Sequence, residues 1–398
     1  NGDHQGSGRV GGDGVMAKIG DVCASKIDTL NAAYNGKIDY IDISAVDNDK
    51  KKITNTETLQ IKEAPSRARQ LVECDDIIVS LVRPNLNAVA VVENSSENLQ
   101  VASTGYCVLR CNQAVYSRYL FYFCQSETFI NRMTAQATGA SYPAVSNSIV
   151  KNCEIPLPER NKQKEIADIL DKVTGLISLR KQQLAKLDEL VKARFVEMFG
   201  DEQAFNKEPL SQNVEEMFIG PFGSSLKNEN FVSKENGYCM VYEQKHAIRK
   251  TMDVETRYID KPKYEELKRF SIHGGDIIVS CRGTIGETYI VPLNAPLGIM
   301  HPSIMKIRVK DSIYNRVFFD FLLQEKLKQH EAQANGSGVK MAVTASALGK
   351  EEFIVPSIPF QNQFAAFVER VDQQKQTVQQ SLEKLELMKK ALMQEYFG

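Results

Sequence analysis

The sequence lacks long apolar runs, an excess of charge of either sign, and closely paired cysteines. No apolar stretch approaches the roughly 18 residues that a membrane-spanning helix needs, so a membrane protein is not predicted. The 398 residues include 49 basic and 50 acidic side chains, and this balance argues against a strongly basic nucleic-acid binder. The 8 cysteines form no Cys-x-x-Cys pair, which argues against zinc. We interpret them as small buried residues of a cytoplasmic protein.

The familiar motifs of catalysis are also missing. The chain has no Gly-x-Gly-x-x-Gly after a predicted strand, no Walker A loop, no His-Glu-x-x-His, and neither tetrapeptide (Asn-Pro-Pro-Phe or Asp-Pro-Pro-Tyr) of the amino-methyltransferases. Ser80 and Ser280 follow apolar runs but lie outside a nucleophile elbow, so we expect them to satisfy backbone groups. The sequence therefore predicts a binding protein with no catalytic residue, metal site or cofactor of its own.

The chain contains an internal repeat. The segment Asp-Ile-Ile-Val-Ser occurs at residues 76–80 and again at 276–280. A Pro-containing junction follows in each half, then a Gln near a helix start (Gln163 and Gln363), a long helical segment and a Phe-Gly stop. This shared order indicates two copies of a repeat of about 200 residues.

Each half combines a mixed globular region, called a head below, with a long helix. Short β-branched runs predict strands at 40–45, 76–82 and 88–92, and at 239–244, 276–280 and 288–291, and helical spacing predicts helices at 117–136 and 314–334. The fold class is therefore α+β with a pseudo-twofold repeat. The expected boundaries are a disordered leader or vector remnant at 1–15, a first head at 16–158, a helix at 159–200, a second head at 201–358 and a helix at 359–398.

The two long segments carry narrow apolar stripes with steps of three and four residues, typical of a helix that pairs with another helix. The first stripe includes Ile166, Leu176 and Leu187, and the second includes Val371 and Leu382. A single stripe on so long a helix is not buried inside a small domain, so we expect the two helices to pair as an antiparallel coiled coil.

These features resemble the specificity (S) subunits of type I restriction–modification systems. The resemblance rests on the Asp-Ile-Ile-Val-Ser segment followed by residues 282–286, the junction at 156–167 and the stretch at 66–68, and it covers nearly the whole chain from Met16. It implies that each head is a target recognition domain for one half of a bipartite, asymmetric DNA sequence. It also implies that the helices set the spacer and dock two methyltransferase subunits, which carry S-adenosylmethionine and methylate adenine, and that restriction subunits join the assembly.

Two other interpretations remain open at the level of sequence. The chain could be a coiled-coil scaffold whose heads bind proteins, or the specificity subunit of a related system whose partner fuses methyltransferase and nuclease. An unrecognised enzyme with a site between the heads is a third class. Residues 16–155 hold 14 basic and 15 acidic side chains, and 209–350 hold 19 and 16, so we expect this chain alone to bind DNA weakly.

Base edges are recognised by Arg, Lys, Asn, Gln, Ser and Thr on loops that enter a groove. Polar loop residues beside Gly or Pro are our candidates in both heads, and Arg282 is the first choice. The predicted DNA-binding residues are Arg83, Asn85, Asn87, Thr138, Ser141, Tyr142, Ser224, Ser225, Lys227, Arg282, Thr284 and Lys340.

Partner subunits need an apolar surface on the helices. Several large side chains stand partly off the predicted stripes, although helix pairing could absorb them. The predicted partner-binding residues are Leu170, Leu190, Phe199, Phe360, Met388 and Phe397.

Overall fold

The structure, a computed structural model, describes residues 15–31, 33–93, 97–282, 284–337 and 344–398, with only the backbone described at 331–337. It divides into two compact units. Unit 1 contains residues 1–183 and 378–398, and unit 2 contains residues 184–377. Each unit therefore combines one head with half of each long helix. Within the described ranges, no helix has both the length and the apolar character that a membrane span requires.

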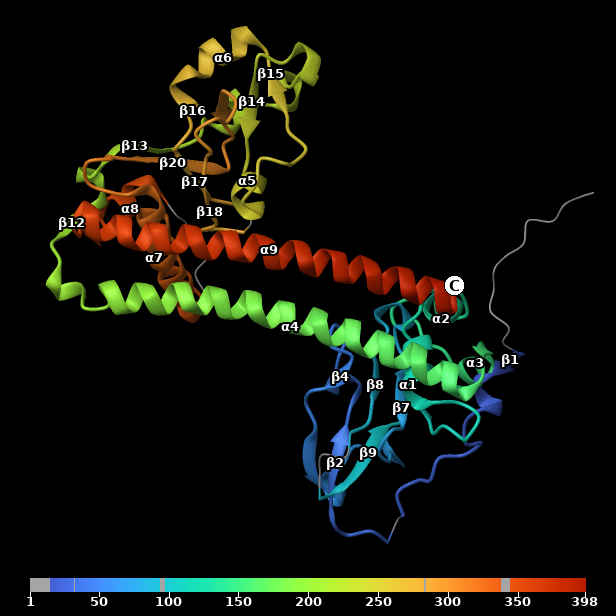
Figure 1. Cartoon of the computed structure of the whole chain (residues 1–398). Helices are drawn as coiled ribbons and strands as arrows, with labels where there is room; N and C mark the ends of the chain where they lie inside the picture. Colours follow the sequence, from blue (N-terminus) through green and yellow to red (C-terminus); the bar gives the residue numbers. More distant parts are fainter. Residues whose placement is uncertain (1–14, 32, 94–96, 283, 338–343) are drawn as a thin grey trace, which may run out of the picture. The chain divides into compact units, whose positions relative to one another are not determined.

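The first head (residues 15–157) contains two main sheets, and Figure 1 labels strands β7 and β8 of one and β2 and β9 of the other. Their strand orders are β10-β7-β8 and β5-β2-β9-β6. Strands β2 and β9 run parallel, and the other pairs in these two sheets are antiparallel. A two-stranded sheet of β1 and β11 joins the start of the head to its end. The strands are β1 Val15–Lys18, β2 Lys37–Ile41, β3 Val46–Asp47, β4 Lys52–Ile53, β5 Glu57–Gln60, β6 Ala68–Leu71, β7 Ile77–Ser80, β8 Val89–Val91, β9 Leu99–Ser103, β10 Tyr106–Leu109 and β11 Glu154–Leu157.

The second head (residues 206–355) repeats this topology. Its sheets have the orders β13-β20-β17-β18 and β15-β14-β19-β16, with β14 parallel to β19, and β12 pairs with β21. The predicted internal repeat is therefore confirmed, with β13 as an added edge strand. The strands are β12 Lys207–Pro209, β13 Val214–Ile219, β14 Cys239–Tyr242, β15 Tyr258–Ile259, β16 Ser271–Ile272, β17 Ile277–Ser280, β18 Thr288–Ile290, β19 Gly298–Met300, β20 Ile304–Val309 and β21 Glu352–Ile354.

The repeated apolar segment forms strand β7 in one head and β17 in the other, and both strands are wholly buried. In the first head, Ile77 and Val79 belong to one core cluster while Ile78 belongs to another. Neighbouring side chains of a strand point to opposite faces, so a strand packed on both faces is apolar at every position. This packing explains the unbroken run that marks the repeat.

One of the two helical stretches predicted in the heads is divided in the structure, and four short helices were not predicted. The expected single helical stretch at 117–136 is two helices, because Ser126 caps the second one by accepting a hydrogen bond from Phe129 N at 3.2 Å. The counterpart in the second head is continuous. The helices of the two heads are α1 Ser117–Phe123, α2 Glu127–Ala135, α3 Asn147–Asn152, α5 Gln244–Arg249, α6 Lys261–Leu267, α7 Arg316–Ser337 and α8 Ala345–Lys350.

The long helices are α4 (Arg160–Phe199) and α9 (Ile358–Phe397), of 40 residues each. In unit 1, the first half of α4 contacts the second half of α9, with an ion pair of Lys181 and Glu386 at 3.1 Å. In unit 2, the other halves meet, and Lys375 lies 2.7 Å from Asp188. The predicted antiparallel pairing is confirmed.

A buried glutamine fixes the start of each long helix to its head. The Gln163 side chain accepts from Tyr116 N at 2.8 Å and donates to two backbone carbonyls. Gln361 repeats the pattern with Asn315 N, also at 2.8 Å, and two carbonyls. The sequence comparison had matched Gln163 with Gln363, but Gln363 is exposed and Gln361 is the true counterpart. Both repeats therefore keep the same three hydrogen bonds. Without them, the polar groups of a buried glutamine would be left unsatisfied, which is costly in free energy.

Candidate nucleic-acid interface

A buried ion pair holds the strand that leads to each candidate loop. In the first head, Arg110 donates to both carboxylate oxygens of Asp76, at 3.0 and 2.8 Å. In the second head, Arg308 donates to Asp276 in the same two-pronged way, at 2.7 and 2.9 Å. Both aspartates are essentially inaccessible, and each also accepts from the backbone three residues earlier. The Asp of the repeated segment is thus an anchor for the loop beyond the strand.

The serine that ends this strand is a second anchor. Ser80 donates to the carbonyl of Val82 at 3.0 Å. Ser280 donates to the carbonyl of Thr284 at 2.6 Å and accepts from Glu287 N at 3.0 Å. Both serines are buried, and their bonds confirm the expectation that they satisfy backbone groups.

The first edge, defined as residues 81–88 and 138–145, brings together two loops that are far apart in the sequence. Arg83 N donates to the carbonyl of Pro143 at 2.7 Å, and Val145 N donates to the carbonyl of Leu81 at 2.9 Å. The Arg83 guanidinium carbon lies 4.8 Å from the centre of the Tyr142 ring, a cation–π contact. The tyrosine thus orients a cation while remaining 68 % exposed itself.

Most predicted residues of this edge are open to solvent. Asn85, Thr138 and Ser141 are exposed, as are Arg83 and Tyr142. They form one surface, because backbone bonds join the two loops. In the sequence these residues lie in two separate segments.

Asn87 is different, and the structure corrects its expected role. It is 7 % exposed, its amide donates to the carbonyl of Cys124 at 2.8 Å, and its side-chain oxygen accepts from Lys51 Nζ at 3.0 Å. Asn87 therefore supports the loop from inside and presents no group to DNA. Burial, with the nearby charge of Lys389, lowers the pKa of Lys51 to about 8. Sequence reasoning missed Lys51, since only the tertiary fold brings it to this loop.

The second edge, defined as residues 220–227, 281–282, 284–287 and 301–303, gathers at one end of the sheet β13-β20-β17-β18. Strands β13 and β17 end there, and β18 and β20 begin there. Cys281 N donates to the carbonyl of Ser303, and Gly220 N to that of Ile304, both at 2.9 Å. A Cβ atom at Gly220 would lie 2.3 Å from a backbone oxygen of the turn, so only glycine permits this close approach.

The predicted residues of the second edge are mostly accessible. Arg282, Thr284, Ser224 and Lys227 are exposed and Ser225 is half-buried. They too come from two separate segments that the sheet brings to one end. Lys340 lies outside the described residues.

Charged side chains surround the second edge. Glu243 pairs with Arg257 and with Lys245, the latter at 2.8 Å. Burial lowers the pKa of His301, and the charges of Arg257 and Arg282 act on it in the same direction. Two of the cations near the edge, Arg257 and Lys245, are therefore already paired with the carboxylate of Glu243.

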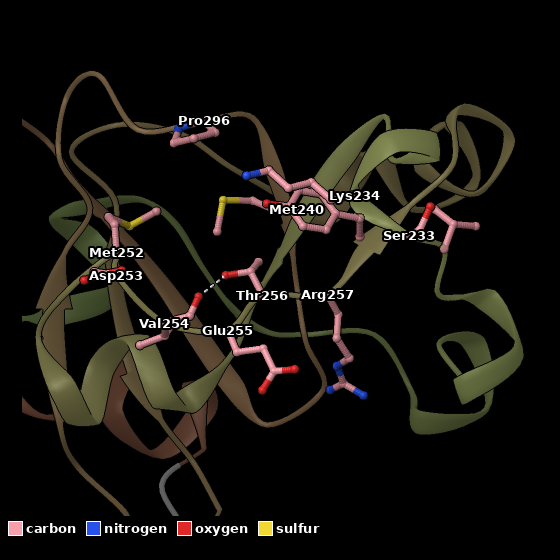
Figure 2. A pocket seen from close by; sticks show the side chains of 12 residues that line it. Ser233, Lys234, Met240, Met252, Asp253, Val254, Glu255, Thr256, Arg257 and Pro296 are labelled. Carbon is pink, nitrogen blue, oxygen red and sulfur yellow. Dashed lines mark hydrogen bonds between the residues drawn. The ribbon is translucent and has the colours of Figure 1, made fainter. Parts of the chain in front are cut away.

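A hollow in the second head is lined by Met240, Met252, Glu255 and Arg257 (Figure 2). Arg257 is occupied, because its guanidinium lies 4.0 Å over the Phe231 ring and pairs with Glu243. Thr256 Oγ1 donates a hydrogen bond to the carbonyl of Val254 at 2.7 Å. Two of the lining residues, Arg257 and Thr256, are therefore already engaged in contacts within the head.

The eight cysteines form no disulfide, and five of them are buried. Burial raises the pKa of Cys107 to about 12 and those of Cys239 and Cys281 to about 11. Cys74 is exposed, which departs from the expectation of buried cysteines. In the part of the chain that the structure describes, no three His, Cys, Asp or Glu side chains are grouped as metal ligands.

Three of the predicted partner-binding residues are buried, which corrects the expectation of an accessible surface. Leu170, Phe199 and Phe397 are at most 2 % exposed. Within unit 2, Phe199 packs on the rings of Phe318 and Phe360, with centroids 4.8 and 5.0 Å apart. These side chains fill the space between the helices and the heads.

The helices do present other apolar side chains. Leu190 is 47 % exposed and Met388 is 52 % exposed, while Phe360 is half-buried. Sequence reasoning placed Leu176 in the seam, but it is 45 % exposed. Leu179 and Leu387 are more exposed still. Both lie off the apolar stripes, and this position in the sequence could have identified them as exposed apolar residues.

Comparison with known proteins identifies the class. The family model for the type I restriction modification DNA specificity domain matches residues 13–189 and 224–387, most of the chain. The chain belongs to this family of type I specificity subunits, which are non-catalytic.

Two relatives and one structure are similar over different lengths. The HindI specificity subunit of Haemophilus influenzae is 26% identical over 153 residues, which are 38% of this chain and 33% of the relative. The putative MjaX specificity subunit of Methanocaldococcus jannaschii is 21% identical over 97% of this chain and 93% of its own. A chain from a structural study of complex assembly and conformational transition of the type I R-M system has a TM-score of 0.58, at 23% identity, and covers 97% of this chain and 98% of its own. This chain thus spans about a third of the first relative and nearly all of the second.

Proposed function

We propose that each head recognises one half of a bipartite, asymmetric DNA target through its edge. The observation that carries this proposal is the repeated design of the two edges. Each follows a strand anchored by a buried Asp–Arg pair, and each exposes an arginine, Arg83 or Arg282, just beyond it. Arginine can bind the two acceptors of a guanine edge in the major groove. The expected readers are Arg83, Asn85, Thr138, Ser141, Tyr142, Ser224, Ser225, Lys227, Arg282, Thr284 and Lys340.

We further propose that the paired helices dock two methyltransferase subunits and set the spacing of the half-sites. The support is that each unit carries exposed apolar side chains on its own half of the helix pair. Leu176, Leu179, Leu387 and Met388 lie in unit 1, and Leu190 lies in unit 2. Large apolar side chains exposed on a helix are typical of surfaces that bind proteins. The proposed assembly also includes restriction subunits.

The proposal is tested by producing the chain together with a type I methyltransferase subunit. We expect a stable complex with two methyltransferase subunits per specificity subunit, and methylation mapping should show adenine methylation at a single split sequence. A chain that fails to associate, or a complex that methylates without sequence preference, would contradict the proposal. The first outcome would favour a scaffold that binds other proteins.

Replacing Arg282 by alanine should relax recognition at the half-site of the second head alone. A two-pronged contact between arginine and guanine contributes about 1–3 kcal/mol of discrimination, so preference there should fall by roughly 5- to 150-fold. Methylation of a library randomised at both half-sites measures the effect. Arg83→Ala is the matched control, and it should relax the other half-site only. Unchanged preference in Arg282→Ala would remove Arg282 from the readers.

A further inference from the structure

The second edge carries a large apolar side chain at its tip. The Phe222 ring is 86 % exposed, the highest value among the exposed large hydrophobic side chains of the described residues. It stands in the loop Gly220-Pro221-Phe222-Gly223, beside the candidate readers Ser224 and Lys227. Leaving a phenylalanine in water forgoes the stabilisation that its burial would give, so its exposure at a proposed binding edge calls for a partner surface.

The backbone that carries this ring is well fixed. Pro221 is buried, and Leu226 is 5 % exposed and belongs to a core cluster of the second head. Gly220 is bound to the turn at 301–304, and Ser225 N donates to the carbonyl of Phe222 at 2.8 Å. The loop is thus attached on both sides of Phe222, and the ring is held outward at the end of the sheet from which Arg282 also projects.

The first edge offers a comparison. Its exposed aromatic ring, Tyr142, has Arg83 stacked on one face. Each edge therefore combines an exposed ring with an arginine loop that follows the same repeated strand. The two rings differ in chemistry: Tyr142 has a hydroxyl and supports a cation, whereas Phe222 has neither donor nor acceptor. Phe222 can gain nothing from phosphates, which prefer cations and hydrogen-bond donors.

We propose that Phe222 packs against an apolar surface of the bases in the half-site that the second head recognises. The proposal rests on the proposed function. DNA offers two such surfaces, the 5-methyl group of thymine in the major groove and the face of a base that has been unstacked. In both cases the ring adds apolar contact to the polar recognition by Arg282, and thereby strengthens specific binding.

The experiment compares Phe222→Ala, Phe222→Leu and Leu293→Ala in the complex with methyltransferase subunits. Leu293 is the matched control, since it is 78 % exposed and follows β18 at the opposite end of the same sheet. Contacts between a base and an aromatic ring weaken on alanine substitution enough to predict about a tenfold loss of affinity for the cognate site with Phe222→Ala. Affinity for unrelated DNA should stay unchanged, and the leucine variant should fall between wild type and alanine. Thermal unfolding of each variant checks that the fold is intact.

Modified DNA distinguishes the two surfaces. If Phe222 contacts a thymine methyl, uracil in place of thymine in the second half-site should weaken wild-type binding but not that of Phe222→Ala. If it packs on an unstacked base, 2-aminopurine placed in that half-site should brighten with wild type and stay dim with the alanine variant. Cognate affinity of Phe222→Ala equal to that of wild type and Leu293→Ala would overturn the inference while leaving the proposed function intact. Loss of specific binding by the wild-type complex itself would instead refute both.

Discussion

Replacing Phe397 by alanine should destabilise unit 1 by about 3–5 kcal/mol, the usual result of deleting a buried aromatic side chain. Phe397 is 2 % exposed and lies at the end of α9, against the rings of Tyr119 and Phe123 of the first head, with centroids 5.2 and 5.8 Å away. Its loss leaves a cavity between the helix end and the head. Urea unfolding followed by circular dichroism measures the change, since the chain has no tryptophan for fluorescence.

The control for Phe397→Ala lies on the same helix. Leu387 is 69 % exposed, so Leu387→Ala should change stability by no more than about 0.5 kcal/mol. Hydrogen exchange should locate the Phe397→Ala effect to the last turns of α9 and to α1. Equal stability of the two variants would show that the contact with Phe397 does not hold the helix to the head.

Replacing Asp276 by alanine should destabilise the second head by about 3 kcal/mol. The aspartate is fully buried, while the Arg308 side chain is 28 % exposed and keeps a second carboxylate, Glu216, at 3.3 Å. Removing one member of a buried ion pair leaves the other without full compensation, which costs about 3–5 kcal/mol. Because Arg308 is partly exposed, we expect a loss of stability at the lower end of this range. Urea unfolding gives the magnitude, and hydrogen exchange of β17 gives the location.

Two further variants make the Asp276 prediction specific. Asp253 is exposed, so Asp253→Ala should leave stability within about 0.5 kcal/mol of wild type. Asp76→Ala, which removes the equivalent pair with Arg110, should destabilise the first head instead. If Asp276→Ala unfolds like Asp253→Ala, the pair is not the anchor of the strand that leads to Arg282.

The shared Phe-Gly ending of the two long helices has a common cause in the structure. Phe199, the last residue of α4, packs in unit 2, whereas Phe397, the last residue of α9, packs in unit 1. Each helix thus leaves the head of its own repeat and ends against the other head. A buried aromatic ring therefore holds each helix end to a head, as expected when two similar units pair in antiparallel fashion.

The sequence by itself determined the duplication, the α+β class, the two long helices and their pairing. Each of these depends on order and periodicity along the chain, such as the two copies of Asp-Ile-Ile-Val-Ser or the apolar stripes that include Val371 and Leu382. Local patterns of this kind follow directly from strand and helix geometry. Even here the sequence matched Gln163 with Gln363, two residues away from its structural counterpart Gln361. A sequence does not distinguish an exposed glutamine from a buried one.

Only the tertiary structure decided which side chains face a partner. Leu170 and Leu176 are both leucines on α4, yet the first is buried and the second is 45 % exposed. Asn85 and Asn87 lie in one loop, but Asn87 turns inward to Lys51 and Cys124. Burial depends on contacts between residues distant in the chain, and no local pattern encodes them. The balanced net charge also left DNA binding undecided. The proposed readers are a few loop residues in each head, and only the fold brings them together at one edge.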